Sequence, residues 1–164
     1  MRRHVYYYTY LPEPFPLAAD VLGGVPARWL PRPALDDGVA WRTTLVAEGA
    51  LPPAVAQRSA LVDLGPSTGT DQLVVRSVGW RASSADQLFP VLTADLELSA
   101  CEGSGCQLSL MGSYRPPLSV VGDVGDRLLG HRIAEACVRR FVLDVAARIE
   151  DAGVQERAGT AERC

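Results

Sequence analysis

The sequence predicts an α+β domain in which an antiparallel sheet of about six strands curls around one long C-terminal helix, with two short helices after the first strand. Short segments of alternating hydrophobicity, separated by Gly- and Pro-rich turns, occupy most of residues 39 to 114. From about residue 123 the apolar period is helical. Because one helix covers only part of a flat sheet of this size, the sheet must curve to bury both apolar surfaces.

The first strand is expected over residues 4 to 11, which are rich in aromatic and β-branched types and end at the turn Pro12-Glu13-Pro14. Residues 15 to 30 then show apolar residues near helical spacing. Gly23-Gly24 and Pro26 interrupt this pattern, which predicts two short helices instead of one long helix.

Two further strands are expected after a loop around residues 31 to 38, the second ending at a GPSTGT turn. They cover residues 39 to 47 and 54 to 64, and each alternates between apolar and polar positions. The residues predicted to face inward are Val39, Trp41, Leu45, Ala47, Ala54, Ala56, Ala60, Val62 and Leu64.

Three more strands are expected at residues 72 to 82, 92 to 100 and 107 to 114, the last two joined as a hairpin by the CEGSGC turn. The alternation is clearest in the second of these. The inward residues are Val74, Val78, Trp80, Ala82, Leu92, Ala94, Leu96, Leu98, Ala100, Leu108, Leu110, Gly112 and Tyr114.

A long helix is expected from a cap at Asp123 or Asp126 to about Asp151. Its apolar stripe consists of Ala134, Val138, Phe141, Val142, Val145 and Ile149, and His131 falls on the same stripe. Residues 153 to 164 have little to bury and are expected as a flexible C-terminal tail, which leaves residues 1 to 152 as one globular domain.

Composition excludes several classes of function. With 16 Lys+Arg against 19 Asp+Glu, the net charge of −3 gives no electrostatic footprint for nucleic acid. No stretch approaches the roughly 18 apolar residues of a membrane span, and no apolar signal-peptide core follows Met1. We therefore expect a cytoplasmic protein without a nucleic-acid partner or an integral membrane segment.

The basic residues are all Arg, and Lys and Asn are absent, which indicates a gene from a high-GC bacterium. Each single Arg consequently carries less functional weight than in a mixed background.

The element order and the block from residue 108 to 150, in which a glycine- and proline-marked strand exit leads into the long helix, resemble the START-like or SRPBCC superfamily. This superfamily includes lipid-transfer domains, the birch-pollen-allergen family and polyketide cyclase/dehydrase-like proteins. The resemblance covers about residues 3 to 150. It implies a helix-grip fold with a cavity between sheet and helix, used mostly for hydrophobic small molecules.

Arg58 and Arg76 occupy the predicted inward faces of adjacent strands, and their numbering parity permits nearly opposite positions across the GPSTGT turn. Like charges repel there, and a guanidinium does not shed its charge. An acceptor is therefore expected between them, either a protein carboxylate or a ligand carboxylate, carbonyl or phosphate. The alternatives are that one or both strands have the opposite phase, or that the side chains reach the rim.

Other candidate ligand contacts are His131, Trp41, Trp80 and Tyr114. His131 has the chemistry of a general acid or base or of a polar anchor at a cavity mouth, and equally that of a structural hydrogen-bonding residue. The three aromatic residues face inward and suit either a planar ligand or an ordinary core.

No catalytic residue, metal site or cofactor is assigned. The GPSTGT segment lacks the Lys of a phosphate loop, and two histidines cannot form a His-rich metal site. Cys101 and Cys106 fall on opposite faces of the predicted hairpin, so both are expected as free thiols.

The sequence thus favours binding of a hydrophobic or amphipathic small molecule, lipid- or polyketide-like, in a cavity between the sheet and the C-terminal helix. An enzyme of the polyketide cyclase/dehydrase kind, with His131 or a Tyr moving a proton, is the first alternative. The second is an accessory interaction module without a functional cavity, which would show an exposed apolar patch.

Overall fold

The computed structural model describes residues 2–36, 40–83, 89–115 and 124–161. Over these residues, seven strands form one antiparallel sheet in the order β1-β7-β6-β5-β4-β3-β2. The strands are β1 (Arg3–Leu11), β2 (Ala34–Asp36), β3 (Ala40–Val46), β4 (Gln57–Gly69), β5 (Leu73–Ala82), β6 (Val91–Ala100) and β7 (Cys106–Arg115). The helices are α1 (Phe15–Gly23), α2 (Pro26–Trp29) and α3 (Val124–Ala161).

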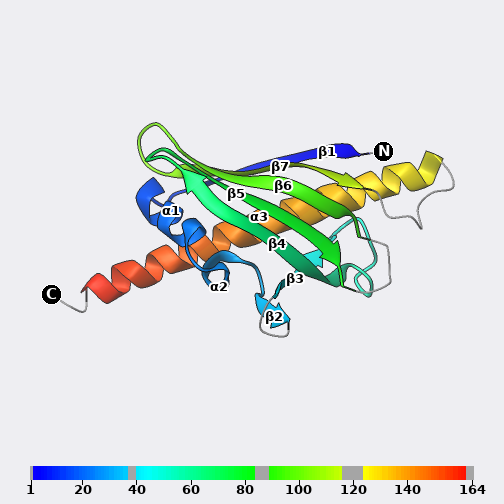
Figure 1. Ribbon diagram of the computed structural model, residues 1–164, viewed down its shortest axis with the longest axis horizontal. Helices are drawn as coiled ribbons and strands as arrows, with labels where there is room; N and C mark the ends of the chain where they lie inside the picture. The colour runs from blue at the N-terminus through cyan, green and yellow to red at the C-terminus, as the bar shows by residue number, and fades with distance from the viewer. Residues whose placement is uncertain (1, 37–39, 84–88, 116–123, 162–164) are drawn as a thin grey trace.

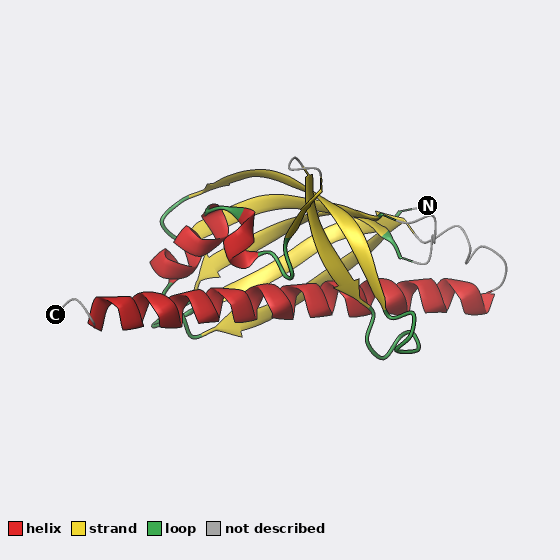
Figure 2. Cartoon of the chain, turned by 90° about the horizontal axis from the view of Figure 1, so that it is seen from below, coloured by secondary structure: helices red, strands yellow, loops and turns green. Residues whose placement is uncertain are grey.

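The sheet curls over α3, as the predicted fold class requires. Figure 1 shows α3 running the whole length of the sheet and extending past it at both ends. Figure 2 shows the strands arching over the helix, with α1 and α2 beside its C-terminal part. Because β1 and β2 are the two edges and do not pair with each other, the sheet is open. The predicted α+β arrangement, including two short helices after the first strand, is confirmed.

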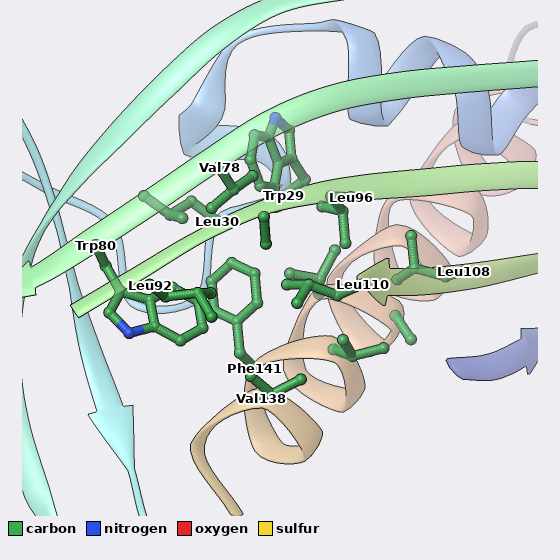
Figure 3. Close-up of a cluster of buried hydrophobic side chains, with 14 of the residues drawn as sticks. Trp29, Leu30, Val78, Trp80, Leu92, Leu96, Leu108, Leu110, Val138 and Phe141 are labelled. Carbon is green, nitrogen blue, oxygen red and sulfur yellow. The ribbon is translucent and has the colours of Figure 1, made fainter. Parts of the chain in front are cut away.

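Most residues predicted to face inward are buried, but Ala54 and Ala100 are exposed because Ala54 precedes β4 and Ala100 is the last residue of β6. Along β6, Leu92, Ala94, Leu96 and Leu98 are buried while Thr93 and Asp95 alternate with them on the outside. Every residue of the predicted α3 stripe from Ala134 to Ile149 is also buried. Figure 3 shows how the two surfaces meet in a cluster of leucine, valine and aromatic side chains. Two residues that the sequence singled out, Val39 and Asp123, lie outside the described residues.

The turn after β4 lies later than predicted. β4 begins at Gln57 instead of residue 54 and continues through most of the GPSTGT segment to Gly69. The pairing with β5 shifts register between Leu64 and Ser67, so Gly65 and Pro66 form a bulge in β4. The chain reverses just beyond β4, where the Thr70 N–H donates to the Leu73 carbonyl at 2.7 Å. The short strand β2, which pairs with β3, replaces part of the expected loop.

α3 is longer than predicted, because its last turns are tied to the first turn of the chain. It begins at Val124, so Asp126 lies inside the helix, and it continues to Ala161 instead of ending near Asp151. Arg157 donates to both carboxylate oxygens of the buried Glu13, at 2.5 and 3.0 Å. Residues 153 to 161, expected as a tail, are part of this helix.

None of the described helices combines the length and the apolar character that crossing a membrane requires.

Candidate functional site

The three predicted aromatic residues lie in one row across the concave face of the sheet. The strand register pairs Trp41 with Val62, Val62 with Trp80, Trp80 with Leu92 and Leu92 with Tyr114. Residues paired in this way point to the same face of a sheet. Since neighbouring strands are about 4.8 Å apart, Trp80 lies about 10 Å along the row from each of the other two aromatic residues. We call these five residues the aromatic row.

A hydrogen-bonded chain leads from the end of the aromatic row to the surface. The Tyr114 hydroxyl lies 2.8 Å from Nδ1 of His131, and Nε2 of His131 lies 3.1 Å from Oε1 of Glu135 on the next turn of α3. The tyrosine is 1% exposed, whereas the side chains of His131 and Glu135 are 40% and 57% exposed. The pair that the sequence proposed separately, Tyr114 and His131, is therefore brought into direct contact.

The buried hydroxyl at the inner end of this chain has a shifted pKa. Burial raises the pKa of Tyr114, and this outweighs the opposite influence of the nearby Arg3 guanidinium. Nε2 of His131 donates to Glu135, and the direction of the Tyr114–His131 hydrogen bond depends on whether Nδ1 carries a proton. The arrangement can pass a proton between a buried hydroxyl and a solvent-accessible carboxylate.

Trp80 supplies a second polar group in the same aromatic row as Tyr114. Its ring is buried and packs on Phe141 of α3, with ring centroids 5.1 Å apart (Figure 3). The indole Nε1–H has no hydrogen-bond partner among the described residues. Leaving such a donor unpaired costs about 1–3 kcal/mol, so this N–H is a donor for any acceptor that reaches it.

The interior around Phe141 is occupied by side chains rather than open in this structure. Trp80, Leu92 and Leu110 from the sheet meet Val138 and Phe141 from α3 in one buried cluster (Figure 3). A molecule bound at this level would have to displace part of the contact between Trp80 and Phe141.

Arg58 and Arg76 are not opposite each other, contrary to the prediction. Arg58 pairs with Leu45 at the start of β4, and Arg76 pairs with Ser67 near its end. The late turn and the bulge place them on the order of 30 Å apart along the sheet. No shared acceptor between them is therefore needed.

Arg76 instead links strand β5 to α1 and α2. Its Nη1 donates to the main-chain carbonyls of Leu22 and Gly24, both at 2.9 Å, and its guanidinium lies 5.1 Å from the ring centroid of Trp29. Carbonyls at a helix C-terminus lack helical partners and carry negative partial charge. Main-chain oxygens thus take the place of the carboxylate or ligand that the sequence suggested.

The described cysteines are free thiols, as predicted for Cys101 and Cys106. Burial raises the pKa of Cys106 to about 11 and that of Cys137 to about 12. Both therefore stay protonated and poorly reactive at neutral pH. Within the described part of the chain, no group of three or more His, Cys, Asp or Glu side chains could hold a metal ion.

Two surface features were missed by the sequence reasoning. Tyr6, Tyr8 and Tyr10 form a ladder on the outer face of β1, with ring centroids 5.8 and 5.7 Å apart, beside the exposed Met111 of β7. Alternation alone left both faces of this strand open, because aromatic residues occupy each. The second feature is a groove over α3, which depends on how the curled sheet meets the helix.

The sheet and α3 together form a helix-grip arrangement, with the aromatic row on the face of the sheet that contacts the helix. No family model and no curated protein sequence matches the chain.

Solved structures with a similar arrangement have low sequence identity to this chain. One is an uncharacterized protein from Rhizobium leguminosarum, with a TM-score of 0.47 and 9% identity, covering 92% of this chain and 96% of its own. Another is an aromatase/cyclase from Streptomyces sp. R1128, with a TM-score of 0.43 and 18% identity over 99% and 95%. A third is norcoclaurine synthase from Thalictrum flavum, with a TM-score of 0.43 and 8% identity over 81% and 84%.

Proposed function

We propose that this chain binds a hydrophobic or amphipathic small molecule between the concave face of the sheet and the N-terminal half of α3. The observation that carries the proposal is the meeting of the aromatic row with the Tyr114–His131 hydrogen bond of 2.8 Å. This combination supplies apolar walls and a few convergent polar groups, as small-molecule sites do.

Each residue has a separate role in the proposed site. Trp41 and Trp80 provide flat apolar walls, and the unpaired Nε1–H of Trp80 donates to a ligand oxygen. Tyr114 and His131 contact the polar end of the molecule near the surface. Arg58 and Arg76 are left out of this site, because the register separates them and Arg76 is engaged with main-chain carbonyls.

Binding at this level moves the Trp80 ring relative to Phe141, since the two are in contact without a ligand. The proposal therefore predicts a change in tryptophan fluorescence on binding.

A second candidate, an enzyme of the polyketide cyclase/dehydrase kind, is favoured by one specific observation. The Tyr114–His131–Glu135 chain connects a buried hydroxyl to solvent through a titratable group, which a carrier does not require. In such an enzyme, Tyr114 or His131 transfers a proton during ring closure or loss of water. A product with the mass of the substrate less water, formed by wild type and absent with His131→Phe, separates this function from simple binding.

The binding proposal is tested by native mass spectrometry of gently purified protein, followed by titration with fatty acids and polycyclic aromatic polyketides. The variant is Tyr114→Phe, and the matched control is Tyr8→Phe, which removes a hydroxyl from the exposed ladder. We expect wild type and Tyr8→Phe to bind the same molecule and Tyr114→Phe to bind about 3- to 10-fold more weakly, as for one lost hydrogen bond. Equal affinity in all three proteins, or no binding by any of them, contradicts the proposal. The no-binding outcome favours the accessory module, for which the ladder beside Met111 is the candidate partner surface.

A further inference from the structure

A groove of about 720 Å³ crosses the exposed side of α3 between β1 and the segment that follows β3. Its apolar lining comes from three elements: Tyr7 of β1, Ala50 of the segment after β3, and Ala136 and Leu143 of α3. Gly49, at the rim, has a positive φ of 76°, and no atom lies within 4 Å of where a Cβ would be. The backbone turns there without a side chain, so this side of the groove stays open.

Two arginines of α3 line this groove without an acidic partner. Arg132 and Arg139 are two helical turns apart and therefore lie on the same side of α3. Both are exposed, and neither makes a hydrogen bond or ion pair with any described residue.

The acidic residues of the groove contact side chains other than Arg132 and Arg139. Glu135 accepts from His131 at 3.1 Å, and Glu48 lies 3.3 Å from Nη1 of Arg140. With Arg132, Arg139 and Arg140 against Glu48 and Glu135, the groove has one more basic than acidic side chain beside its apolar lining, although the whole chain carries a net charge of −3.

We infer that this groove binds an amphipathic anion, with a carboxylate or phosphate head held by Arg132 and Arg139 and an alkyl or aryl body on Tyr7, Ala136 and Leu143. A guanidinium matches either head in a bidentate geometry. The apolar lining contributes in proportion to the apolar area that the body buries. This site differs from the interior site proposed above, although Glu135 borders both, and the arginine variants test it without changing Tyr114 or His131.

Isothermal titration calorimetry with four probes tests the inference: decanoate, decyl phosphate, decanol and inorganic phosphate. We expect the two amphipathic anions to bind more tightly than either the neutral alcohol or the bare anion, because both halves of the groove contribute. Comparison of the first two probes identifies the preferred head.

The test variant is the double substitution Arg132→Gln/Arg139→Gln. Its matched control is Arg81→Gln/Arg115→Gln, which makes the same charge change at two exposed residues of the sheet, outside this groove. We expect the test variant to lose about tenfold or more in affinity for the better anion, while the control stays within about twofold of wild type.

Three results overturn the inference: no binding of either amphipathic anion to wild type, equal losses in the two double variants, or unchanged affinity in the test variant. Tyr114→Phe identifies the interior site separately. A probe that is weakened by Tyr114→Phe and unaffected by the arginine substitutions binds in the interior, which also contradicts the groove.

Discussion

The two halves of α3 lie in contrasting surroundings. Around the C-terminal half, polar contacts join different elements: Arg157 binds Glu13, and Arg76 binds the α1 carbonyls of Leu22 and Gly24, while the Trp29 N–H has no described partner. Around the N-terminal half, His131 and Glu135 remain partly exposed and the Trp80 N–H has no described partner. The contrast therefore lies in exposure. We call the C-terminal half of α3 and its surroundings the closed end, where polar contacts hold elements together. We call the N-terminal half and its surroundings the open end, where titratable side chains are accessible to solvent and to a ligand.

The largest expected effect is a loss of stability at the closed end. Trp29 is completely buried beneath Arg76, so Trp29→Ala should lower the free energy of unfolding by about 3–5 kcal/mol. Urea denaturation followed by circular dichroism measures the change. Val25→Ala, at an exposed position just before α2, should change it by less than about 0.5 kcal/mol. Similar losses in both variants would show that this end is not tightly packed.

The next effect is smaller and depends on pH. The hydrogen bonds from Arg157 lower the pKa of Glu13 below its ordinary value of 4.5. The ion pair therefore stabilises the fold fully above that ordinary value, and this stabilisation is lost as the pH falls through the lower value of the folded state. Wild type should be more stable than Glu13→Gln at pH 7, and the difference should shrink steadily below pH 4.5.

Urea midpoints across this pH range measure that difference. Glu102→Gln, an exposed carboxylate in the turn before β7, is the matched control and should show no comparable trend. A difference for Glu13→Gln that stays constant down to acid pH would contradict the role of the ion pair.

The smallest effect on stability is expected at the open end. Tyr114→Phe removes the hydroxyl that contacts His131 and should lower the free energy of unfolding by about 0.5–1.5 kcal/mol. The same variant should have the larger effect on ligand affinity. If Tyr114→Phe destabilised the fold as much as Trp29→Ala, the open end would be as structural as the closed end.

The sequence predicted the parts of the fold that depend on local periodicity. The alternation of β6 and the stripe of α3 from Ala134 to Ile149 follow from side-chain period alone, and both are confirmed. The predicted end of α3 near Asp151 was wrong, because the last turns of the helix are held by Arg157. Its partner Glu13 lies near the other end of the sequence. The predicted position of the turn after β4 was also wrong, because Gly65-Pro66 is equally compatible with a bulge inside the strand.

The candidate site was predictable as residue types and not as an arrangement. Trp41, Trp80 and Tyr114 were each expected to face inward, but their common row depends on the register of four strand pairs. A one-residue change in register moves a side chain to the other face, so parity cannot supply this information. The same dependence explains why Arg58 and Arg76, although of matching parity, are far apart.

The most direct test of the difference between the two ends is a ¹⁵N nuclear magnetic resonance titration of the tryptophan indole N–H signals with a bound small molecule identified by mass spectrometry. The chain has 3 tryptophans, and single Trp→Phe variants assign their signals. We predict that the signals of Trp80 and Trp41 shift on binding while that of Trp29, at the closed end, stays in place. A Trp29 shift as large as that of Trp80, or a titration in which Trp80 does not move, would contradict a ligand site at the N-terminal half of α3.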